Sequence, residues 1–512
     1  MQPEAAEKTT ASTRKPDPTI VVIFGASGDL TKKKLLPALF HLEESGLLPE
    51  EFAVVGVARR DLSKTFTPDM KKAIVDSGAK DDDPKLAAFM EKVSYFTTNF
   101  DDSDGYKRLN EALATVDKEK GTKGNRLFYL AVAPEYFQEI IDKLGEQKMD
   151  KAAESTRDAH VRVIIEKPFG HDTTSARELN DGVAKVFGEE QIFRIDHYLG
   201  KETVQNIFVL RFGNAFFEPL WNAEHVDNVQ ITAAESIGIE GRGPFYEKAG
   251  VSRDILQNHM MEMLEFVAMD KPASNDAKDV IAEKVKLLKA IKPLTDANTV
   301  RGQYGAGTVG SEQAKPYREE DRVDPKSVTE TFAAVKLEID TPRWKGVPFY
   351  LRAGKRLAKR VTEIVIEYKP QKDAILEGAT EAEAAGGCVG IPTNLLRLRI
   401  QPDEGITLAF GNKRPTPDTV VCPVTAQFKY VDAFGKYTAN GYERLLLDAM
   451  LGDASLFTHR DAVETAWGIY TPLLEDWSAH PPSDFPNYAS GTWGPEESDA
   501  LLARDGRRWN EV

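Results

Sequence analysis

Residues 19–30 read TIVVIFGASGDL, six apolar or β-branched residues followed at once by a turn that contains two glycines. Such an unbroken run is typical of a strand buried on both faces, as in a parallel sheet. From Leu30 the apolar residues recur at helical spacing, and the helix is expected to end near Gly46. The order of strand, turn and helix predicts a phosphate-binding turn, because glycines admit a pyrophosphate and a helix N-terminus offers free N–H donors.

The turn itself supplies the first candidate cofactor-binding residues. The pattern G-x-G-x-x-G would place a third glycine where Leu30 stands, so the string alone is a weak signal and a plain strand-to-helix turn is the alternative. Its place between a buried strand and a helix favours nucleotide binding. The candidates are Gly25, Ser27, Gly28, Asp29 and Leu30.

A second buried strand is predicted at residues 52–58, FAVVGVA, and it ends at Arg59 and Arg60. NAD-specific sites usually carry an acidic residue at this point, which accepts hydrogen bonds from the ribose hydroxyls. A guanidinium there favours the 2′-phosphate of NADP instead. We therefore expect Arg59 to contact NADP; the alternative is that both arginines are solvated surface residues.

The rest of the chain shows two different patterns of apolar residues. Up to about residue 195, strand-like runs at 126–132 and 160–166 alternate with helical segments, which indicates a parallel sheet covered by helices. Beyond that point apolar residues recur at every second position, as in an antiparallel sheet with one wet face; these segments are 229–235, 331–339, 362–368 and 395–401.

The predicted fold class is therefore α/β plus α+β. We expect a flexible tail at residues 1–17 and an N-terminal Rossmann-like parallel-sheet domain at 18–195. A larger domain at 196–512 is expected to hold a mostly antiparallel sheet backed by helices, with substrate-binding and oligomerisation roles.

Composition excludes several classes of function. The net charge is −15 over 512 residues, which argues against nucleic acid and anionic membranes as partners. No stretch approaches the ~18 apolar residues of a membrane span. The eight histidines show no H-E-x-x-H or close-paired spacing, so no metal is expected. With only Cys388 and Cys422 and no leader-like N-terminus, we expect a reducing, cytoplasmic location.

Lys167 lies in Glu166-Lys167-Pro168, at the carboxyl end of a predicted parallel strand, where open α/β sheets bind ligands. The proline holds the lysine in an extended conformation. This arrangement predicts an ammonium directed into the crevice, with a surface or ion-paired lysine as an equal alternative.

Residues 194–201, RIDHYLGK, concentrate polar groups after the last predicted strand of the first domain. If this segment is helical, His197, Tyr198 and Lys201 are spaced so that their donors converge on one side. Such a cluster suits a phosphate monoester. A polar helix start is the alternative.

Asp254, Asn258 and His259 interrupt the otherwise apolar segment 252–269, which predicts a buried helix. A lone histidine in such a setting is by default a satisfied core residue, unless a carboxylate from elsewhere meets it. In an ideal α-helix Asp254 and His259 lie about 140° apart. Either a ligand wraps around the helix end or the helix is irregular there.

Five longer motifs, in order from about residue 20 to the C-terminus, resemble the glucose-6-phosphate dehydrogenase family, NADP-dependent and of eukaryotic type. They are IFGASGDLTKKKLLPALF, EKPFGHD, RIDHYLGKE, EGRGPFYEKAGVSRDILQNHMMEML and VPFYLRAGKRL. RIDHYLGKE is the most diagnostic of them, since GASGDL alone occurs in many nucleotide-binding turns.

The resemblance implies oxidation of β-D-glucose 6-phosphate to 6-phospho-D-glucono-1,5-lactone, with hydride transfer to NADP, at the entry to the oxidative pentose phosphate pathway. It implies that His259 is the general base and that Asp196 orients it. Two alternatives stay open: an NADP dehydrogenase for another phosphorylated sugar, and a non-catalytic NADP-binding sensor.

The resemblance also assigns binding roles and partners. His197, Tyr198 and Lys201 would hold the phosphate, and Lys167 would touch both substrate and cofactor. It implies a homodimer or tetramer. The remaining implied substrate ligands are Lys355 for the phosphate or sugar, and Glu235, Asp254 and Gln401 for the sugar hydroxyls.

Overall fold

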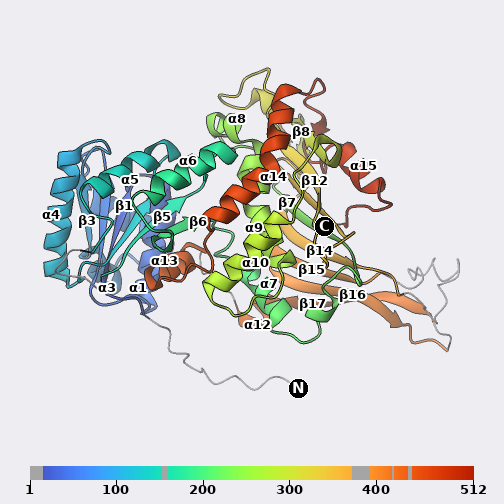
Figure 1. The fold of residues 1–512 in the computed structure, drawn as a ribbon, viewed down its shortest axis with the longest axis horizontal. Coiled ribbons are helices and arrows are strands. Elements are labelled where there is room, and N and C mark those ends of the chain that lie inside the picture. Colours follow the sequence, from blue (N-terminus) through green and yellow to red (C-terminus); the bar gives the residue numbers. More distant parts are fainter. Residues whose placement is uncertain (1–14, 153–158, 372–392, 418–419, 436–440, 512) are drawn as a thin grey trace. The chain divides into compact units, whose positions relative to one another are not determined.

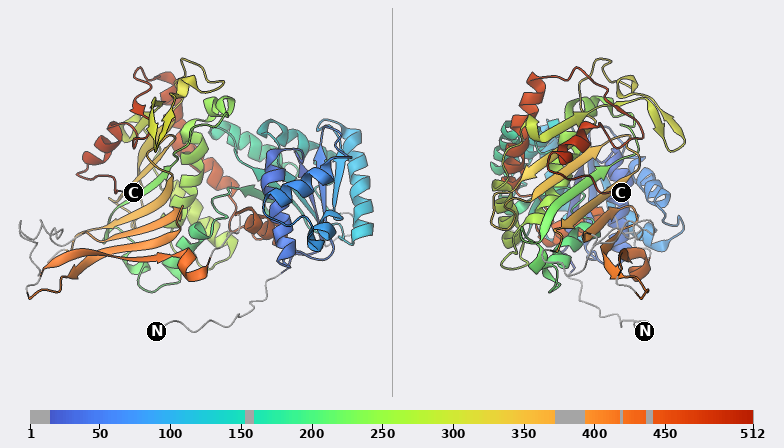
Figure 2. Two further views of the ribbon diagram at one scale, coloured as in Figure 1. Left: turned by 180° about the vertical axis from the view of Figure 1, so that it is seen from behind. Right: turned by 90° about the vertical axis from the view of Figure 1, so that its right-hand side faces the viewer.

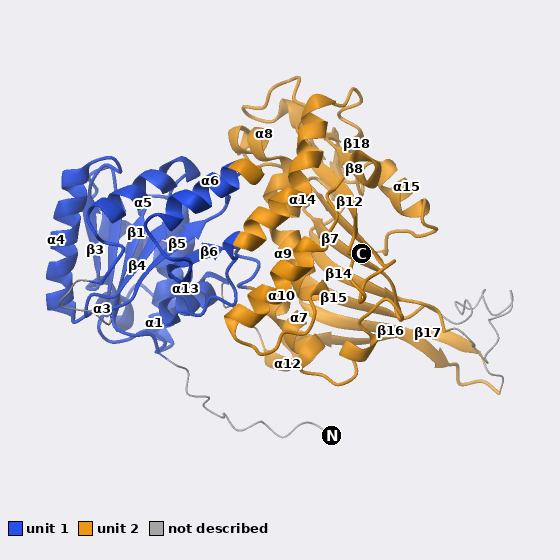
Figure 3. Cartoon of the chain, viewed as in Figure 1, with its two compact units in different colours: residues 1–170, 175–200, 439–460 blue, residues 171–174, 201–438, 461–512 orange. Residues whose placement is uncertain are grey.

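The computed structural model describes residues 15–152, 159–371, 393–417, 420–435 and 441–511. Of the predicted flexible tail, residues 1–14 lie outside this part. The chain forms two compact units, drawn in different colours in Figure 3. Unit 1 comprises residues 1–170, 175–200 and 439–460, and unit 2 comprises residues 171–174, 201–438 and 461–512.

Unit 1 is built on a six-stranded sheet in the order β3-β2-β1-β4-β5-β6, and all its neighbouring strands are parallel. The order reverses between β1 and β4, which is where open α/β sheets bind ligands. The predicted parallel sheet is confirmed. The strands are β1 (Thr19–Phe24), β2 (Phe52–Ala58), β3 (Val93–Thr97), β4 (Arg126–Leu130), β5 (Val161–Glu166) and β6 (Ile192–Ile195).

The helices of unit 1 form two groups. Helices α1, α2 and α3 pack on one another and α13 packs on α1, whereas α4 packs against α5 on the other side of the sheet (Figure 1). The bounds are η1 (Thr31–Leu35), α1 (Leu36–Glu44), α2 (Phe66–Asp76), α3 (Pro84–Met90), α4 (Ser103–Lys120), η2 (Pro134–Tyr136), α5 (Phe137–Glu146), α6 (Thr173–Ala184), η4 (Glu189–Gln191) and α13 (Gly441–Leu451).

Unit 2 is built on an eight-stranded sheet in the order β17-β16-β15-β14-β7-β13-β12-β8. Every pair is antiparallel except β7 with β13, so the sheet is mostly antiparallel as predicted. The strands are β7 (Val226–Ala234), β8 (Thr299–Gly302), β12 (Phe332–Glu338), β13 (Pro348–Gly354), β14 (Val361–Tyr368), β15 (Leu395–Gln401), β16 (Gly405–Lys413) and β17 (Val421–Lys429). Four short strands, β9 (Tyr304–Gly305), β10 (Gly307–Val309), β11 (Glu312–Ala314) and β18 (Tyr488–Ala489), pair in two small ladders.

Helices back this second sheet. The π-helical segment η6 packs on β7, β12 and β13, and α9, which continues it, packs against α7 and α10 (Figure 2). The bounds are α7 (Glu202–Phe212), η5 (Glu218–Leu220), α8 (Gly243–Val251), η6 (Ser252–Met260), α9 (Met261–Ala268), α10 (Ala277–Lys289), η7 (Asp296–Asn298), η8 (Tyr317–Glu319), α12 (Tyr430–Phe434), α14 (Arg460–Ala479) and α15 (Glu497–Ala503). Among the described helices, none combines the length and apolar character needed to cross a membrane.

The compact units differ from the division into 18–195 and 196–512. The change of unit after β6 falls at Gly200, close to the expected boundary, but residues 439–460 return to unit 1. There Glu443 of α13 accepts from His41 of α1 at 3.0 Å, and Arg162 of β5 donates to the carbonyl of Met450 at 2.6 Å. Apolar periodicity can indicate a helix such as α13, but it does not indicate which sheet the helix packs with. The sequence therefore could not predict that residues 439–460 belong to unit 1.

Candidate functional site

The predicted nucleotide turn of unit 1 lies at the switch point of the parallel sheet. Gly25 has φ +84°, and a Cβ on it would lie 2.2 Å from the Ala131 carbonyl oxygen that follows β4. Gly28 donates to the Gly25 carbonyl at 2.9 Å and closes the turn. Asp29 is exposed and forms an ion pair with Lys33 at 2.8 Å. Ser27 and Leu30 are half-buried beside it. Only glycine fits at position 25, because the backbone has a positive φ and packs directly against the segment that follows β4.

Arg59, at the end of β2, is exposed and held by aromatic rings. Its guanidinium lies 4.8 Å from the centre of the Tyr136 ring and 5.4 Å from that of Phe100. Its Nη1 also donates to the Tyr136 hydroxyl at 3.1 Å. Cation–π contacts of this kind hold the planar group in place while leaving further N–H donors for an anion.

Lys167 follows β5 directly and is half-buried, beside an unusual carboxylate. The Tyr129 hydroxyl donates to Glu166 at 2.5 Å, and Tyr442 of α13 donates to the same carboxylate. Burial raises the pKa of Glu166 to about 7, although the two tyrosines and Lys167 act in the opposite direction. The lysine at the strand end thus has a neighbour that titrates near neutral pH.

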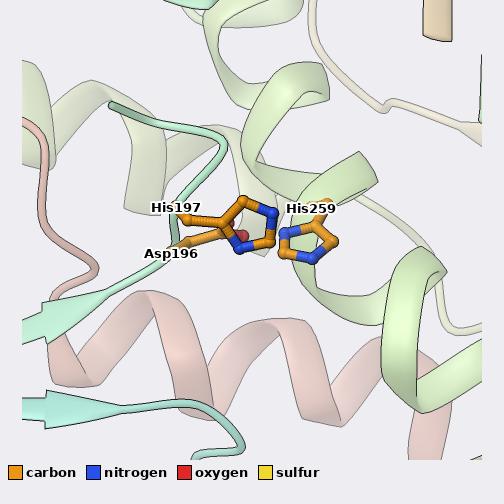
Figure 4. Close-up of side chains that lie close together, drawn as sticks. All are labelled: Asp196, His197 and His259. Atoms are coloured by element: carbon orange, nitrogen blue, oxygen red, sulfur yellow. The ribbon is translucent and has the colours of Figure 1, made fainter. Parts of the chain in front are cut away.

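The segment after β6 forms a turn, not the helix considered from the sequence. Asp196 is fully buried, its Oδ1 accepts from the Tyr198 N–H at 2.9 Å, and its carbonyl accepts from Leu199 at 3.0 Å. The rings of His197 and Tyr198 lie side by side, 5.1 Å between centres. Figure 4 shows Asp196 and His197 on this turn. The convergence of His197 and Tyr198 with Lys201 stays a prediction, because the helix on which it was based does not form.

Lys201 lies in unit 2, where it precedes α7 and reaches the end of β15. Its Nζ donates to Oε1 of Gln401, and the Gln401 amide donates to the Thr362 hydroxyl at 3.2 Å. The ammonium is therefore held in a fixed place by a residue two hundred positions away in sequence. Both residues were predicted substrate ligands.

Lys355 and Glu235 meet at the carboxyl ends of the parallel pair β13 and β7. They form an ion pair in which the lysine side chain is buried and the carboxylate is one-third exposed. The Lys355 ammonium also lies 5.6 Å from the centre of the Tyr246 ring. Burial raises the pKa of Tyr246 far above its usual value, with Asp254 and Glu235 adding to the effect, so its hydroxyl stays protonated.

Asp254 and His259 lie on η6, which is a π-helix. Of the two alternatives that the sequence left open, a ligand wrapped around the helix end or an irregular helix, the structure shows the irregular helix. The hydrogen bonds of a π-helix run from residue i to i+5, and its winding is looser than that of an α-helix, so residues five apart lie much closer to one face than in an α-helix. Asp254 and His259 are five apart and therefore share a face of η6. His259, shown in Figure 4, is buried, and Asp254 is half-buried.

The predicted site residues divide between the units. In unit 1 lie Gly25, Ser27, Gly28, Asp29, Leu30, Arg59, Lys167, Asp196, His197 and Tyr198; in unit 2 lie Lys201, Glu235, Asp254, His259, Lys355 and Gln401. Four tyrosines that sequence reasoning missed support them: Tyr129, Tyr136, Tyr246 and Tyr442. No local pattern distinguishes these from ordinary core tyrosines, because their partners come from distant segments.

Comparison with known proteins identifies the family. A model described as "Glucose-6-phosphate dehydrogenase, NAD binding domain" matches residues 22–206, and one described as "Glucose-6-phosphate dehydrogenase, C-terminal domain" matches residues 208–510. The chain belongs to the glucose-6-phosphate dehydrogenase family. The two matches together cover both sheets.

Individual relatives support membership of the glucose-6-phosphate dehydrogenase family over the full length. Glucose-6-phosphate 1-dehydrogenase of Chlamydia pneumoniae is 46% identical over 98% of each chain, and that of Rhizobium meliloti is 43% identical over 97% of this chain and 98% of the relative. Since both organisms are bacteria, they lend no support to the expectation of a eukaryotic type.

Solved structures of the family have the same fold. A glucose-6-phosphate dehydrogenase in complex with its substrate glucose 6-phosphate superimposes with a TM-score of 0.86 at 36% identity, covering 97% of this chain and all of that one. The enzyme from Mycobacterium avium gives a TM-score of 0.80 at 33% identity, with 97% and 99% covered.

Proposed function

We propose that this chain oxidises β-D-glucose 6-phosphate to 6-phospho-D-glucono-1,5-lactone and transfers the hydride to NADP, the first step of the oxidative pentose phosphate pathway. The observation that carries the proposal is full-length membership of the family, including 36% identity to a dehydrogenase solved with this substrate. The chain contains candidate residues for binding the nucleotide, for binding the phosphate of the substrate and for transferring the proton.

In this proposal His259 removes the proton of the anomeric hydroxyl as the hydride leaves. Proton removal at this stage avoids a high-energy cation, and an imidazole is suited to it near neutral pH. Asp196 orients the imidazole and stabilises its protonated form. The turn that follows β6 supports this role, because a backbone N–H already fixes one Asp196 oxygen.

The substrate is held at both ends. His197, Tyr198 and Lys201 bind its phosphate, and Lys167 contacts both substrate and cofactor. Lys201 and Lys355 are each held by a polar neighbour, so their ammonium groups lose little freedom on binding. The other proposed sugar ligands are Glu235, Asp254 and Gln401.

For the cofactor, we propose NADP rather than NAD, with Arg59 on the 2′-phosphate and the Gly25 turn on the pyrophosphate. When bound, the nicotinamide accepts the hydride. The aromatic support of Arg59 and the lack of an acidic residue at the end of β2 favour this choice. Assembly as a homodimer or tetramer and a cytoplasmic location are further proposals. Cell fractionation tests the location.

The decisive experiment replaces His259 by alanine. We expect kcat to fall by roughly 10²- to 10⁴-fold while glucose 6-phosphate still binds, because the side chain moves a proton and does not hold the phosphate. NADPH formation followed by absorbance measures kcat, and calorimetry measures binding. His480→Ala, at an exposed histidine, is the matched control and should leave both unchanged. Normal turnover by the His259 variant would remove this residue from the mechanism.

Cofactor choice is tested with Arg59→Ala. We expect KM for NADP to rise by about 10- to 100-fold, in line with the loss of one charged hydrogen bond, and KM for NAD to change little. Arg60→Ala, the neighbouring exposed arginine, is the control. An equal rise in KM for NADP and for NAD would show that Arg59 does not bind the 2′-phosphate.

The alternative of another phosphorylated sugar is decided by substrate comparison. Turnover of glucose 6-phosphate should exceed that of galactose 6-phosphate, and free glucose should be rejected strongly, since donors built for a phosphate would be left unpaired. No turnover of any of them would favour the non-catalytic sensor.

A further inference from the structure

The π-helical segment η6 begins at a special point of the backbone. Gly250, the residue before the cap of η6, has φ 58° and ψ −178°, a conformation that residues with a side chain rarely adopt. A Cβ at Gly250 would lie 2.3 Å from Oε1 of Glu330. The chain therefore enters η6 through a bend against which the Glu330 carboxylate is directly packed.

Glu330, which lies just before β12, binds two successive N–H groups at this entrance. Its main-chain carbonyl accepts from Val251 at 3.0 Å, and its Oε1 accepts from Ser252 at 3.2 Å. Val251 caps η6 and Ser252 is its first residue. These amides belong to the first turn, where a helix leaves its N–H groups without internal partners. One residue thus ties both the cap and the first residue of η6 to the sheet.

The carboxylate itself lies in an unfavourable place. Only 9% of Glu330 is exposed, and burial raises the pKa of its carboxyl. Hydrogen bonds from its own N–H and from Ser252, and the charge of Arg253, act in the opposite direction. A carboxylate at a helix N-terminus is further favoured by the helix dipole. The local structure therefore holds this acid in one position and leaves it little room to move.

The position of this anchor matters because it sets the register of η6. Asp254 lies two residues after Ser252, and His259 lies five after Asp254. They share a face only while the segment keeps i to i+5 hydrogen bonds, since α-helical winding would turn them about 140° apart.

We propose that Glu330 is a positioning residue that anchors the start of η6 and thereby holds Asp254 and His259 on one face of the helix. This inference rests on the proposed function in one respect, namely that His259 is the base. Glu330 acts through η6, by its bonds to Val251 and Ser252.

The test compares Glu330→Ala with Glu330→Gln. The alanine variant loses the side-chain acceptor for Ser252, and we expect kcat to fall by about 10- to 100-fold, as for a small displacement of a catalytic group. KM for NADP should stay unchanged, because the nucleotide turn lies in unit 1. The glutamine variant keeps an acceptor oxygen and should recover most of kcat. If the alanine variant does not fold, Glu330→Asp, which is one methylene too short to reach, serves the same purpose.

Asp83→Ala is the matched control. Asp83 also accepts an N–H at a helix start, from Lys85 at 2.8 Å in α3, but it lies in unit 1 and touches no predicted site residue. The Asp83→Ala substitution should lower Tm without changing kcat or KM. If the alanine variants at 330 and 83 lower Tm alike and both keep kcat, Glu330 is merely structural and the proposal fails.

Hydrogen exchange of the amides of residues 251–260 separates this proposal from the proposed function. We expect faster exchange in the alanine variant and restored protection in the glutamine variant, whatever His259 does. Should His259→Ala retain turnover, the base assignment fails while this exchange still reports the anchor. Unchanged exchange in Glu330→Ala would overturn the anchor itself.

Discussion

At Glu166, hydroxyls from two distant tyrosines meet one carboxylate. Tyr129 donates from β4, and Tyr442 donates from α13, far along the chain. Burial outweighs these bonds and raises the pKa of Glu166 to about 7. The folded protein therefore keeps a proton on this side chain between about pH 4.5 and 7, whereas the unfolded chain releases it.

This difference predicts how stability depends on pH. The stability that the protonated Glu166 contributes is complete below about pH 4.5 and is lost as pH rises to about 7, a change of up to about 3 kcal/mol. Glu166→Gln stays uncharged, so relative to the parent it should gain stability as pH rises over this range. Urea unfolding between pH 4.5 and 8 measures the difference. Glu111→Gln, at an exposed position of α4, should instead run parallel to the parent. A constant offset for Glu166→Gln would contradict the prediction.

At the scale of elements, the junction of β1 with η1 shows why the turn needs glycine first. The backbone of Gly25 is left-handed and packs on the segment after β4, with no space for a side chain. Gly46, after α1, has a similar φ of +70°, but a Cβ there would meet nothing within 4 Å. Substitution at Gly46 therefore introduces backbone strain alone, whereas substitution at Gly25 introduces strain together with a steric clash.

Gly25→Ala should therefore cost more than Gly46→Ala. We expect about 1–2 kcal/mol of unfolding free energy from strain at Gly46, and a further 1–3 kcal/mol at Gly25 from the clash with the Ala131 carbonyl. Only Gly25→Ala should also raise KM for NADP. Denaturant unfolding and cofactor titration measure the two effects. Equal losses of stability would show that the Gly25 turn can relax around a methyl group.

At the scale of the whole molecule, unit 1 is completed by a segment from near the C-terminus. Gly200 and Gly441 are in close contact, since a Cβ on Gly200 would lie 2.4 Å from the Gly441 carbonyl oxygen. Beyond this contact Phe457 packs edge-on against Phe193 of β6, with ring centres 4.8 Å apart. The parallel sheet therefore depends on chain that is synthesised after most of unit 2.

A dissected unit 1 tests this dependence. Residues 15–200 alone should be several kcal/mol less stable than the same residues joined from Gly200 to Gly441 by a short glycine–serine linker and ended at residue 460. The reason is the loss of buried apolar area on α13, where Leu445 and Leu446 are fully buried. Thermal unfolding followed by circular dichroism compares the two. Leu446→Asp in the joined chain should abolish the gain in stability that α13 provides. Identical melting curves would mean that α13 adds nothing to unit 1.

The sequence by itself determined the family and four strands of each sheet, namely β1, β2, β4 and β5 in one and β7, β12, β14 and β15 in the other. It also supplied the nucleotide turn and the candidate residues as predictions. These follow from short-range patterns: β1 and β2 are unbroken apolar runs with the bounds predicted, and β15 alternates as predicted. Periodicity reports the environment of a strand only in part. β7, β12 and β14 alternate in sequence, but they are buried at nearly every position, so the wet face expected for them is wrong.

Only the tertiary structure decided the pairings between distant segments: α13 with unit 1, the two tyrosines on Glu166, and the parallel neighbours β7 and β13. It also decided the winding of η6, because local residue preferences do not separate a π-helix from an α-helix, whereas the contacts that anchor the helix end do. Here the anchor, Glu330, lies about seventy residues beyond the helix that it holds. Such contacts depend on packing, which no local pattern encodes.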